Sequence, residues 1–187
     1  LFRPDRVHAV AGVDMAVRRG ETIGIVGESG CGKSTLAKVM VGLQAPTSGD
    51  VVFNGRSVLR RNARTRKEFG RAISIVFQDP MTSLNPTFTV GWQLREALQL
   101  HTKYKTKEAA NQRSIELLKM VGVNEPESRV KQYPFELSGG MRQRVMIAMA
   151  LSTNPKLLIA DEPTTALDVT IQAQIMELMA ELKEQMD

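Results

Sequence analysis

A glycine-rich stretch early in the chain has the residue types, at the spacing, of a phosphate-binding loop. The sequence GESGCGKST, from Gly27 to Thr35, contains the pattern G-x-x-x-x-G-K-[ST] between an apolar, β-branched run and a helical one. In such a loop the glycines let backbone N–H groups surround a β-phosphate, and Lys33 reaches the β- and γ-phosphates. The hydroxyl of Ser34 is a ligand for Mg²⁺, and Thr35 adds another hydroxyl. We therefore expect a nucleotide-binding loop made of Gly27, Glu28, Ser29, Gly30, Cys31, Gly32, Lys33, Ser34 and Thr35.

Two adjacent carboxylates follow another apolar run. The sequence LLIADEP places Asp161 and Glu162 directly after residues typical of a buried strand. Because ligands bind at the carboxyl ends of parallel strands, these acids are expected beside the phosphate loop. Asp161 would hold Mg²⁺, directly or through a water, and Glu162 would polarise the water that attacks a γ-phosphate. Alone, the sequence DEP would indicate only the end of a strand followed by a turn. Because the same chain contains the phosphate loop, a catalytic role for these two acids is favoured.

Alternating strands and helices are expected to position these residues. Apolar, β-branched runs predict strands, and apolar residues at spacings of three and four predict helices. Strands are expected at residues 13–17, 22–26, 72–77 and 156–160, with a hairpin at residues 50–58 that turns at Asn54-Gly55. Helices are expected at residues 33–42, 90–100, 107–122 and 169–186. This order predicts a mainly parallel sheet interrupted by a block of helices.

Composition limits the class of protein. The 187 residues are 42% apolar, enough for one sizeable core, and the apolar runs are too short to cross a bilayer. Cys31 is the single cysteine, which excludes an intrachain disulfide and fits a reducing compartment. His8 and His101 are isolated and do not form a metal cluster.

The positive charge of the chain is concentrated in one segment. Residues 56–71 carry seven basic residues and one acid, a net of 7 − 1 = +6, whereas the whole chain has a net charge of +5. Such a run is typical of a solvated helix between two strands. Contact with anionic lipid or nucleic acid is the alternative, although no aromatic residues are interleaved for base stacking.

Five motifs in a fixed order resemble one family. GESGCGKST, VFQDP, LSGGMRQR, LLIADEP and TALD occur in the order found in the ATP-binding subunits of ABC transporters. The stretches VFQDPMTSLNP and ELSGGMRQRVMIAMAL resemble more narrowly the oligopeptide and dipeptide importers, a branch that also includes nickel and glutathione uptake systems. The resemblance spans nearly the whole chain.

The resemblance implies an α/β fold with a P-loop NTPase core, a mainly parallel sheet, an N-terminal antiparallel β part and a helical subdomain. Residues 1–187 would form a single ABC ATPase domain, with the nucleotide-binding core at 1–88 and 153–187 and the helical subdomain at 89–152. The family also has a histidine after the next strand that contacts the γ-phosphate. We expect this histidine beyond Asp187, which implies a C-terminally truncated domain.

Further site residues follow from the resemblance. Gln78 would bind Mg²⁺ and the attacking water, Asp168 would contact a second ATPase chain, and Phe2 is the nearest candidate for stacking on adenine. Residues of LSGGM would bind the γ-phosphate held by a facing chain: Ser138, Gly139, Gly140 and Met141. Met141 stands where the family more often has Gln. A plain helix cap by Ser138 is the alternative, and both roles are compatible.

The resemblance implies ATP and Mg²⁺ as ligands and a transport role. The expected partners are a second ABC ATPase subunit, identical or different, two transmembrane permease subunits and, indirectly, a solute-binding protein. The chain would lie peripherally on the cytoplasmic face of the cell membrane. An ABC-type ATPase that acts on nucleic acid is the alternative, but the compact segment after Gln78 favours a permease partner. A small-molecule kinase would leave LSGGM and TALD unexplained.

Overall fold

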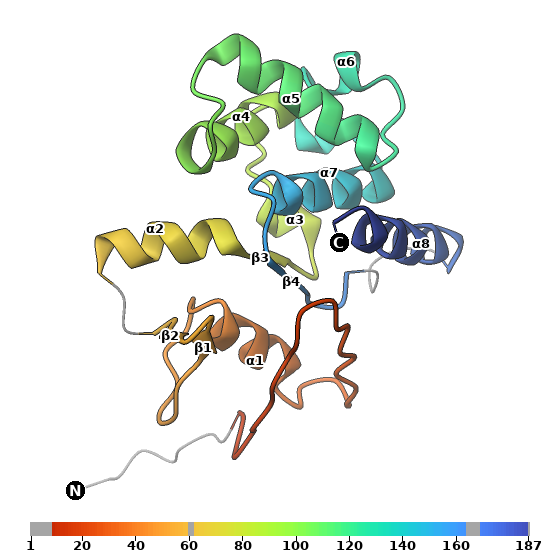
Figure 1. Cartoon of the computed structure of the whole chain (residues 1–187). Helices are drawn as coiled ribbons and strands as arrows, with labels where there is room; N and C mark the ends of the chain where they lie inside the picture. The colour runs from red at the N-terminus through yellow and green to blue at the C-terminus, as the bar shows by residue number, and fades with distance from the viewer. Residues whose placement is uncertain (1–8, 60–61, 164–168, 187) are drawn as a thin grey trace, which may run out of the picture. The chain divides into compact units, whose positions relative to one another are not determined.

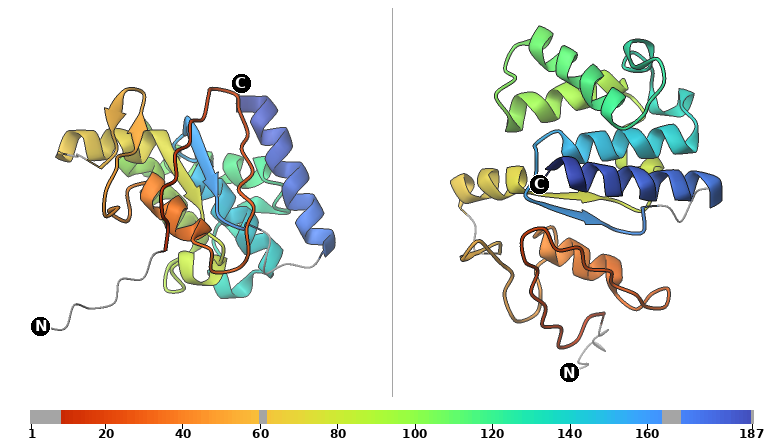
Figure 2. Two further views of the ribbon diagram at one scale, coloured as in Figure 1. Left: turned by 90° about the horizontal axis from the view of Figure 1, so that it is seen from below. Right: turned by 45° about the vertical axis from the view of Figure 1, so that its right-hand side comes forward.

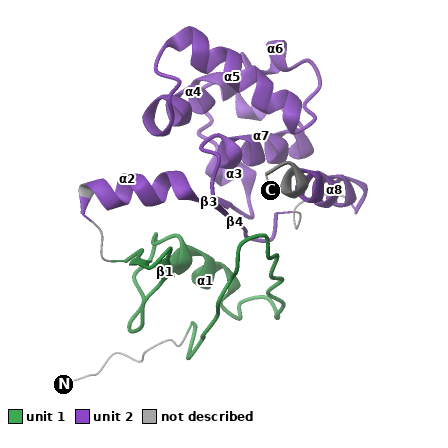
Figure 3. Ribbon diagram, in the orientation of Figure 1, with its two compact units in different colours: residues 1–60, 187 green, residues 61–186 purple. Residues whose placement is uncertain are grey.

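The computed structural model describes residues 9–59, 62–163 and 169–186. The chain divides into two compact units, residues 1–60 with residue 187 and residues 61–186 (Figure 3). The phosphate loop belongs to unit 1, and the strand-end acids and LSGGM belong to unit 2.

The described part of unit 1 contains one helix and one hairpin. Helix α1 (Lys33–Met40) begins at the predicted residue, and strands β1 (Val52–Phe53) and β2 (Arg56–Ser57) pair antiparallel. Asn54 and Gly55 form the turn, with φ of 49° and 75°. Two successive positive φ angles are typical of a tight hairpin turn, so the predicted hairpin is confirmed.

The two strands expected before the phosphate loop do not form. Residues 13–17 and 22–26 do not form strands. The turn between them is closed by a hydrogen bond from Glu21 N to Arg18 O. Val13 and Ile25 remain 51% and 46% exposed. A β-branched run becomes a strand only when a neighbouring strand satisfies its backbone groups. The antiparallel β structure described in unit 1 is therefore the β1–β2 hairpin.

Unit 2 has a parallel strand pair and most of the helices. Strands β3 (Ile73–Val76) and β4 (Leu157–Ala160) pair in parallel, with Val76 opposite Ala160, which confirms the expected parallel arrangement. The helices of the unit are α2 (Ala63–Ala72), α3 (Pro80–Ser83), α4 (Val90–His101), α5 (Lys107–Met120), α6 (Pro126–Arg129), the 3₁₀ helix η1 (Pro134–Glu136), α7 (Gly139–Leu151) and α8 (Val169–Met186).

Helix α7 lies at the centre of unit 2, between the β3–β4 pair and helices α4 and α5 (Figures 1 and 2). It is apolar around most of its circumference, and Val145, Ile147 and Ala148 are fully buried. Leu94, Leu98 and the leucines of α5 pack in the same core. An element buried on all sides needs such a sequence.

Threonine and serine side chains define where three of these helices begin. Thr89, Thr106 and Ser138 each accept a hydrogen bond from the backbone N–H three residues later, at the start of α4, α5 and α7. Each cap satisfies a donor that the helix itself leaves unpaired. None of the helices in the described part of the chain is long and apolar enough to span a bilayer.

Candidate functional site

The phosphate loop closes around the side chain of its own lysine. Lys33 Nζ donates to the carbonyl oxygens of Gly27 and Glu28 at 2.8 and 2.9 Å. Cys31 N also donates to Glu28 O at 3.3 Å, so the loop turns back on itself before α1. The lysine therefore places its positive charge in the concave side of the loop. The Cys31 thiol is exposed and unbridged.

Gly32 occupies a position that no other residue fits. It is the N-cap of α1, with φ of 100°, in the left-handed region. A Cβ atom there would lie 2.2 Å from the carbonyl oxygen of Ala9. Both the backbone angle and this close approach require glycine, which explains in physical terms the second glycine of the motif.

The strand-end residues of unit 2 are brought together by the β3–β4 register. Gln78 lies two residues after Val76, and Asp161 and Glu162 follow Ala160, the partner of Val76. Gln78 Nε2 donates to Glu162 Oε2 at 3.0 Å. Because the strands are parallel, both loops leave the sheet at the same edge. The contact joins residues 84 positions apart in the sequence.

Asp161 and Glu162 have different environments despite being adjacent. Asp161 is 7% exposed and its backbone N–H donates to Val76 O at 2.9 Å, which continues the strand ladder. Glu162 is half-buried and has φ of 44°. A non-glycine residue at positive φ is uncommon and often occurs at functional sites. This turn directs the chain so that the Glu162 carboxylate reaches Gln78.

The LSGGM segment is the first turn of α7. Ser138 is exposed, and its Oγ accepts a hydrogen bond from Met141 N at 3.3 Å. The expected helix cap is therefore present. Gly139, Gly140 and Met141 are half-buried.

Gly140 also has a packing role within the chain. A Cβ atom on Gly140 would lie 3.0 Å from Ile171 Cγ2, so the start of α7 packs tightly against α8. The expected phosphate role of this glycine does not include such a contact, and the sequence offered no signal for it because Ile171 is 171 − 140 = 31 positions away.

Two arginines that follow LSGGM support it and were not singled out from the sequence. Arg142 Nη1 donates to Leu137 O at 2.8 Å, which holds the residue before the cap. Arg144 donates to Val121 O and to Gln174 Oε1, and so links α7 to α5 and α8. Two charged residues in a mainly apolar helical segment were the sequence signal that could have identified them.

The predicted metal ligands have suitable chemistry. Ser34, Gln78 and Asp161 provide hydroxyl, amide and carboxylate oxygens, which are the donor types that Mg²⁺ prefers. Ser34 lies in unit 1 and the other two in unit 2. Within the described ranges, no group of three His, Cys, Asp or Glu residues could hold a metal ion.

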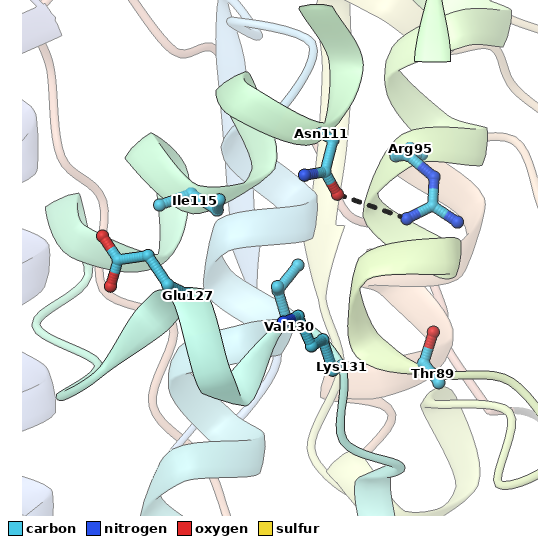
Figure 4. A pocket seen from close by; sticks show the side chains of 7 residues that line it. All are labelled: Thr89, Arg95, Asn111, Ile115, Glu127, Val130 and Lys131. Carbon is cyan, nitrogen blue, oxygen red and sulfur yellow. Dashed lines mark hydrogen bonds between the residues drawn. The ribbon is translucent and has the colours of Figure 1, made fainter. Parts of the chain in front are cut away.

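Two of the predicted site residues, Phe2 and Asp168, fall outside the described residues. A pocket among α4, α5 and α6 contains none of the predicted site residues; in it Arg95 Nη1 donates to Asn111 Oδ1 at 3.4 Å (Figure 4). The pocket is lined by Thr89, Arg95, Asn111, Ile115, Glu127, Val130 and Lys131.

Comparison with known sequences agrees with the family that the five motifs resemble. Residues 10–165 match the family model described as ABC transporter. The oligopeptide transport ATP-binding protein OppD of Bacillus subtilis is 52% identical over 187 residues, which are 97% of this chain and 52% of the relative. The dipeptide transport ATP-binding protein DppD of Escherichia coli is 51% identical over 182 residues, 94% of this chain and 55% of the relative. The chain spans about half the length of the curated relatives it matches.

Solved structures share the fold. The dimeric ATP-binding cassette MJ0796, in a post-hydrolysis state bound to ADP and Pi, aligns with a TM-score of 0.84 and 33% identity, over 95% of this chain and 75% of that chain. The cbiO1 protein of Clostridium perfringens, part of the transporter complex cbiONQ, aligns with a TM-score of 0.77 and 30% identity, over 95% of this chain and 68% of that chain. The expected α/β fold of ABC ATPases is confirmed.

Proposed function

The chain belongs to the ABC transporter family, and from that premise we propose that it is the ATP-binding and ATP-hydrolysing subunit of an importer for oligopeptides or dipeptides. The similarity to peptide transport ATP-binding proteins over more than nine-tenths of the chain supports this solute class. The nucleic-acid alternative has no comparable support, since both of these relatives are transport proteins.

One contact supports the hydrolytic role most directly: the hydrogen bond from Gln78 to Glu162 at the edge of the β3–β4 pair. Glu162 would accept a proton from the water that attacks the γ-phosphate, and Gln78 would hold the carboxylate in one orientation. Lys33 and the loop from Gly27 to Thr35 would bind the β- and γ-phosphates.

Mg²⁺ would be held by Ser34, Gln78 and Asp161. When bound, the ion neutralises the charge of the phosphate oxygens. Asp161 is suited to this role because its buried position at the end of β4 limits competition from solvent.

The second half of the site would come from another chain. Ser138, Gly139, Gly140 and Met141 would bind the γ-phosphate held by a facing ATPase subunit, and Asp168 would contact that subunit. The similarity to a cassette solved as a dimer supports this arrangement. Two permease subunits and a solute-binding protein would complete the importer, with this chain on the cytoplasmic face of the membrane.

Within this chain, we propose that residues 1–88 and 153–187 serve as the nucleotide-binding core and residues 89–152 as a helical subdomain. Helices α4, α5, α6 and α7, together with η1, lie within the second range.

The test is reconstitution of the native complex, purified through this chain, into liposomes. We expect ATP-dependent uptake of labelled di- and oligopeptides and ATP hydrolysis stimulated by the loaded solute-binding protein. ATP hydrolysis that responds to nucleic acid, with no membrane subunits in the purified complex, would contradict the proposal.

A further inference from the structure

We propose that the exposed face of α2, together with the end of α4, is a contact surface for the anionic phospholipids of a membrane. We call it the α2–α4 basic patch, and it consists of Arg64, Lys67, Arg71, His101 and Lys105. The choice of lipid rests on the proposed transport function, because that function places the chain beside a bilayer.

Helix α2 presents three of its four cations along one stripe, and Arg66 lies outside it. Arg64, Lys67 and Arg71 are at positions i, i+3 and i+7 and are exposed, whereas Phe69 is 5% exposed and holds another side of the helix against unit 2. A capping box fixes the start of the helix, with Asn62 and Thr65 exchanging side-chain to backbone hydrogen bonds. The stripe is therefore presented by an ordered helix.

These three cations form no ion pair within the described structure, although Glu68 lies one turn from Arg64 and from Arg71 on the same helix. No ion pair or side-chain hydrogen bond to Arg64, Lys67 or Arg71 is formed by any residue in the described ranges, and Glu68 is the single acid of α2. By contrast, Arg113 and Arg129 in the same unit each pair with a glutamate at 3.0 and 3.3 Å. The positive charge of α2 is thus available to an external anion.

The end of α4 lies beside these cations, and Lys105 after it adds another positive charge. His101 Cε1 would lie 3.8 Å from a Cβ on Gly70, so the imidazole packs beside α2. The positive charges of Arg71, Lys67 and Lys105 act on it, in addition to burial, and lower its pKa. The His101 Nδ1 atom is buried and has no hydrogen-bond partner among the described residues. Like charges gathered in this way repel one another, and an anion at the surface would relieve the repulsion.

A lipid surface fits this geometry better than other anions. From Arg64 to Arg71 the stripe extends about 10 Å along the helix, which suits several phosphate groups more than one phosphate ion. Arginine binds phosphodiesters through paired N–H groups. The aromatic residue of α2, Phe69, is buried, so the helix has no exposed ring on which nucleic-acid bases could stack.

The experiment measures sedimentation of the full chain with vesicles of phosphatidylcholine alone or mixed with phosphatidylglycerol. We expect binding only to the anionic vesicles and a loss of binding at high salt. The double variant Lys67→Glu/Arg71→Glu should reduce partitioning by about thirtyfold or more, since each basic residue near an anionic surface contributes about a fivefold effect and charge reversal adds repulsion. Lys67→Gln/Arg71→Gln should cause a smaller loss in the same direction.

The matched control is Lys38→Glu/Lys131→Glu, which changes the net charge equally at two exposed lysines outside the patch. Its partitioning should remain close to that of the unchanged chain. Equal losses in both double variants, unaffected binding in the patch variant, or complete competition by inorganic phosphate at matched ionic strength would each overturn the proposal. Patch-dependent binding of single-stranded nucleic acid without vesicle binding would also overturn it.

The ATP affinity of each variant, measured by calorimetry, keeps this test separate from that of the proposed function. The basic patch contains no residue of the phosphate loop, so patch variants should bind ATP as the unchanged chain does. An unchanged chain that fails to bind ATP would contradict the proposed function, whereas the vesicle result would still decide whether the patch binds lipid.

Discussion

At the scale of single residues, the Lys33 ammonium group already faces the carbonyls of its own loop. Because it would supply charge to the β- and γ-phosphates, Lys33→Ala should weaken Mg-ATP binding by about 2–4 kcal/mol, the scale of a charge-assisted contact. Calorimetry measures the affinity. Lys38→Ala, on the exposed side of the same helix, is the control and should have little effect. Equal affinities for the two variants would remove Lys33 from the binding site.

Gly32 and Gly30 permit a matched comparison. Both have positive φ, at 100° and 82°. A Cβ on Gly32 would clash with Ala9 O, whereas no atom of the described residues lies within 4 Å of a Cβ on Gly30. Gly30→Ala should therefore cost about 1 kcal/mol of stability from backbone strain alone, and Gly32→Ala should cost more. Thermal unfolding checks the order of the two variants. A more stable Gly32→Ala would show that the loop does not approach Ala9 in solution.

His101 predicts a stability change with pH. Burial first, and then Arg71, Lys67 and Lys105, lower its pKa in the folded chain below the ordinary value of 6.5. As the pH falls through about 6.5, the unfolded chain binds a proton that the folded chain does not, so the free energy of unfolding decreases. Denaturant titrations above and below this pH should show a smaller decrease in His101→Gln. NMR titration of an unshifted His101 would contradict the assignment.

At the scale of elements, the parallel register of β3 and β4 places Gln78 against Glu162. If Glu162 orients the attacking water, Glu162→Gln should retain ATP binding and reduce turnover at least ~100-fold in the assembled complex. Turnover by phosphate release and binding by calorimetry are measured on the same preparation. Near-normal turnover would assign the proton acceptor to another residue.

The elements that the sequence predicted correctly are those with a local cause. Asn54-Gly55 predicted the hairpin through its turn chemistry, and the runs before Phe77 and Asp161 predicted β3 and β4 through their β-branched residues. The segments at 13–17 and 22–26 have the same local pattern but no strand partner in the described structure, so that prediction was wrong.

The candidate site residues came from the sequence, whereas the contacts between them did not. The motif pattern identified Lys33 and Glu162, and the family resemblance identified Gln78. The distance between Gln78 and Glu162 depends on strand register, and the contact of Gly140 with Ile171 depends on helix packing. Neither is encoded in the spacing of one motif, which explains why sequence reasoning did not supply them.

At the scale of the whole molecule, the cap of α7 allows the shared-site proposal to be tested. A serine hydroxyl has one donor and two acceptor positions, so Ser138 Oγ can accept from Met141 N and still donate to a phosphate on a facing chain. Ser138→Asp should keep the cap and place a negative charge against that phosphate. Ser138→Ala should lose the cap, at about 1 kcal/mol, without adding repulsion.

We therefore expect Ser138→Asp to abolish ATP-dependent association with the partner ATPase while leaving the thermal stability of the isolated chain nearly unchanged. Ser138→Ala should lower stability and weaken association less. Light scattering in a Glu162→Gln background measures association, and calorimetry on the isolated chain measures ATP affinity. If Ser138→Asp instead weakens ATP binding by the isolated chain, LSGGM serves the nucleotide of its own chain.

Helix α7 passes from an exposed N-cap, Ser138, through a half-buried first turn to a fully buried middle. Its amide hydrogens should therefore exchange with solvent on very different timescales along a single helix. The amides after Val145 should exchange only when unit 2 opens as a whole, whereas the turn after Ser138 should exchange through local fraying. Fraying the first turn does not require the buried turns to open. The LSGGM end of α7 can therefore rearrange against another surface many times within the lifetime of the folded core.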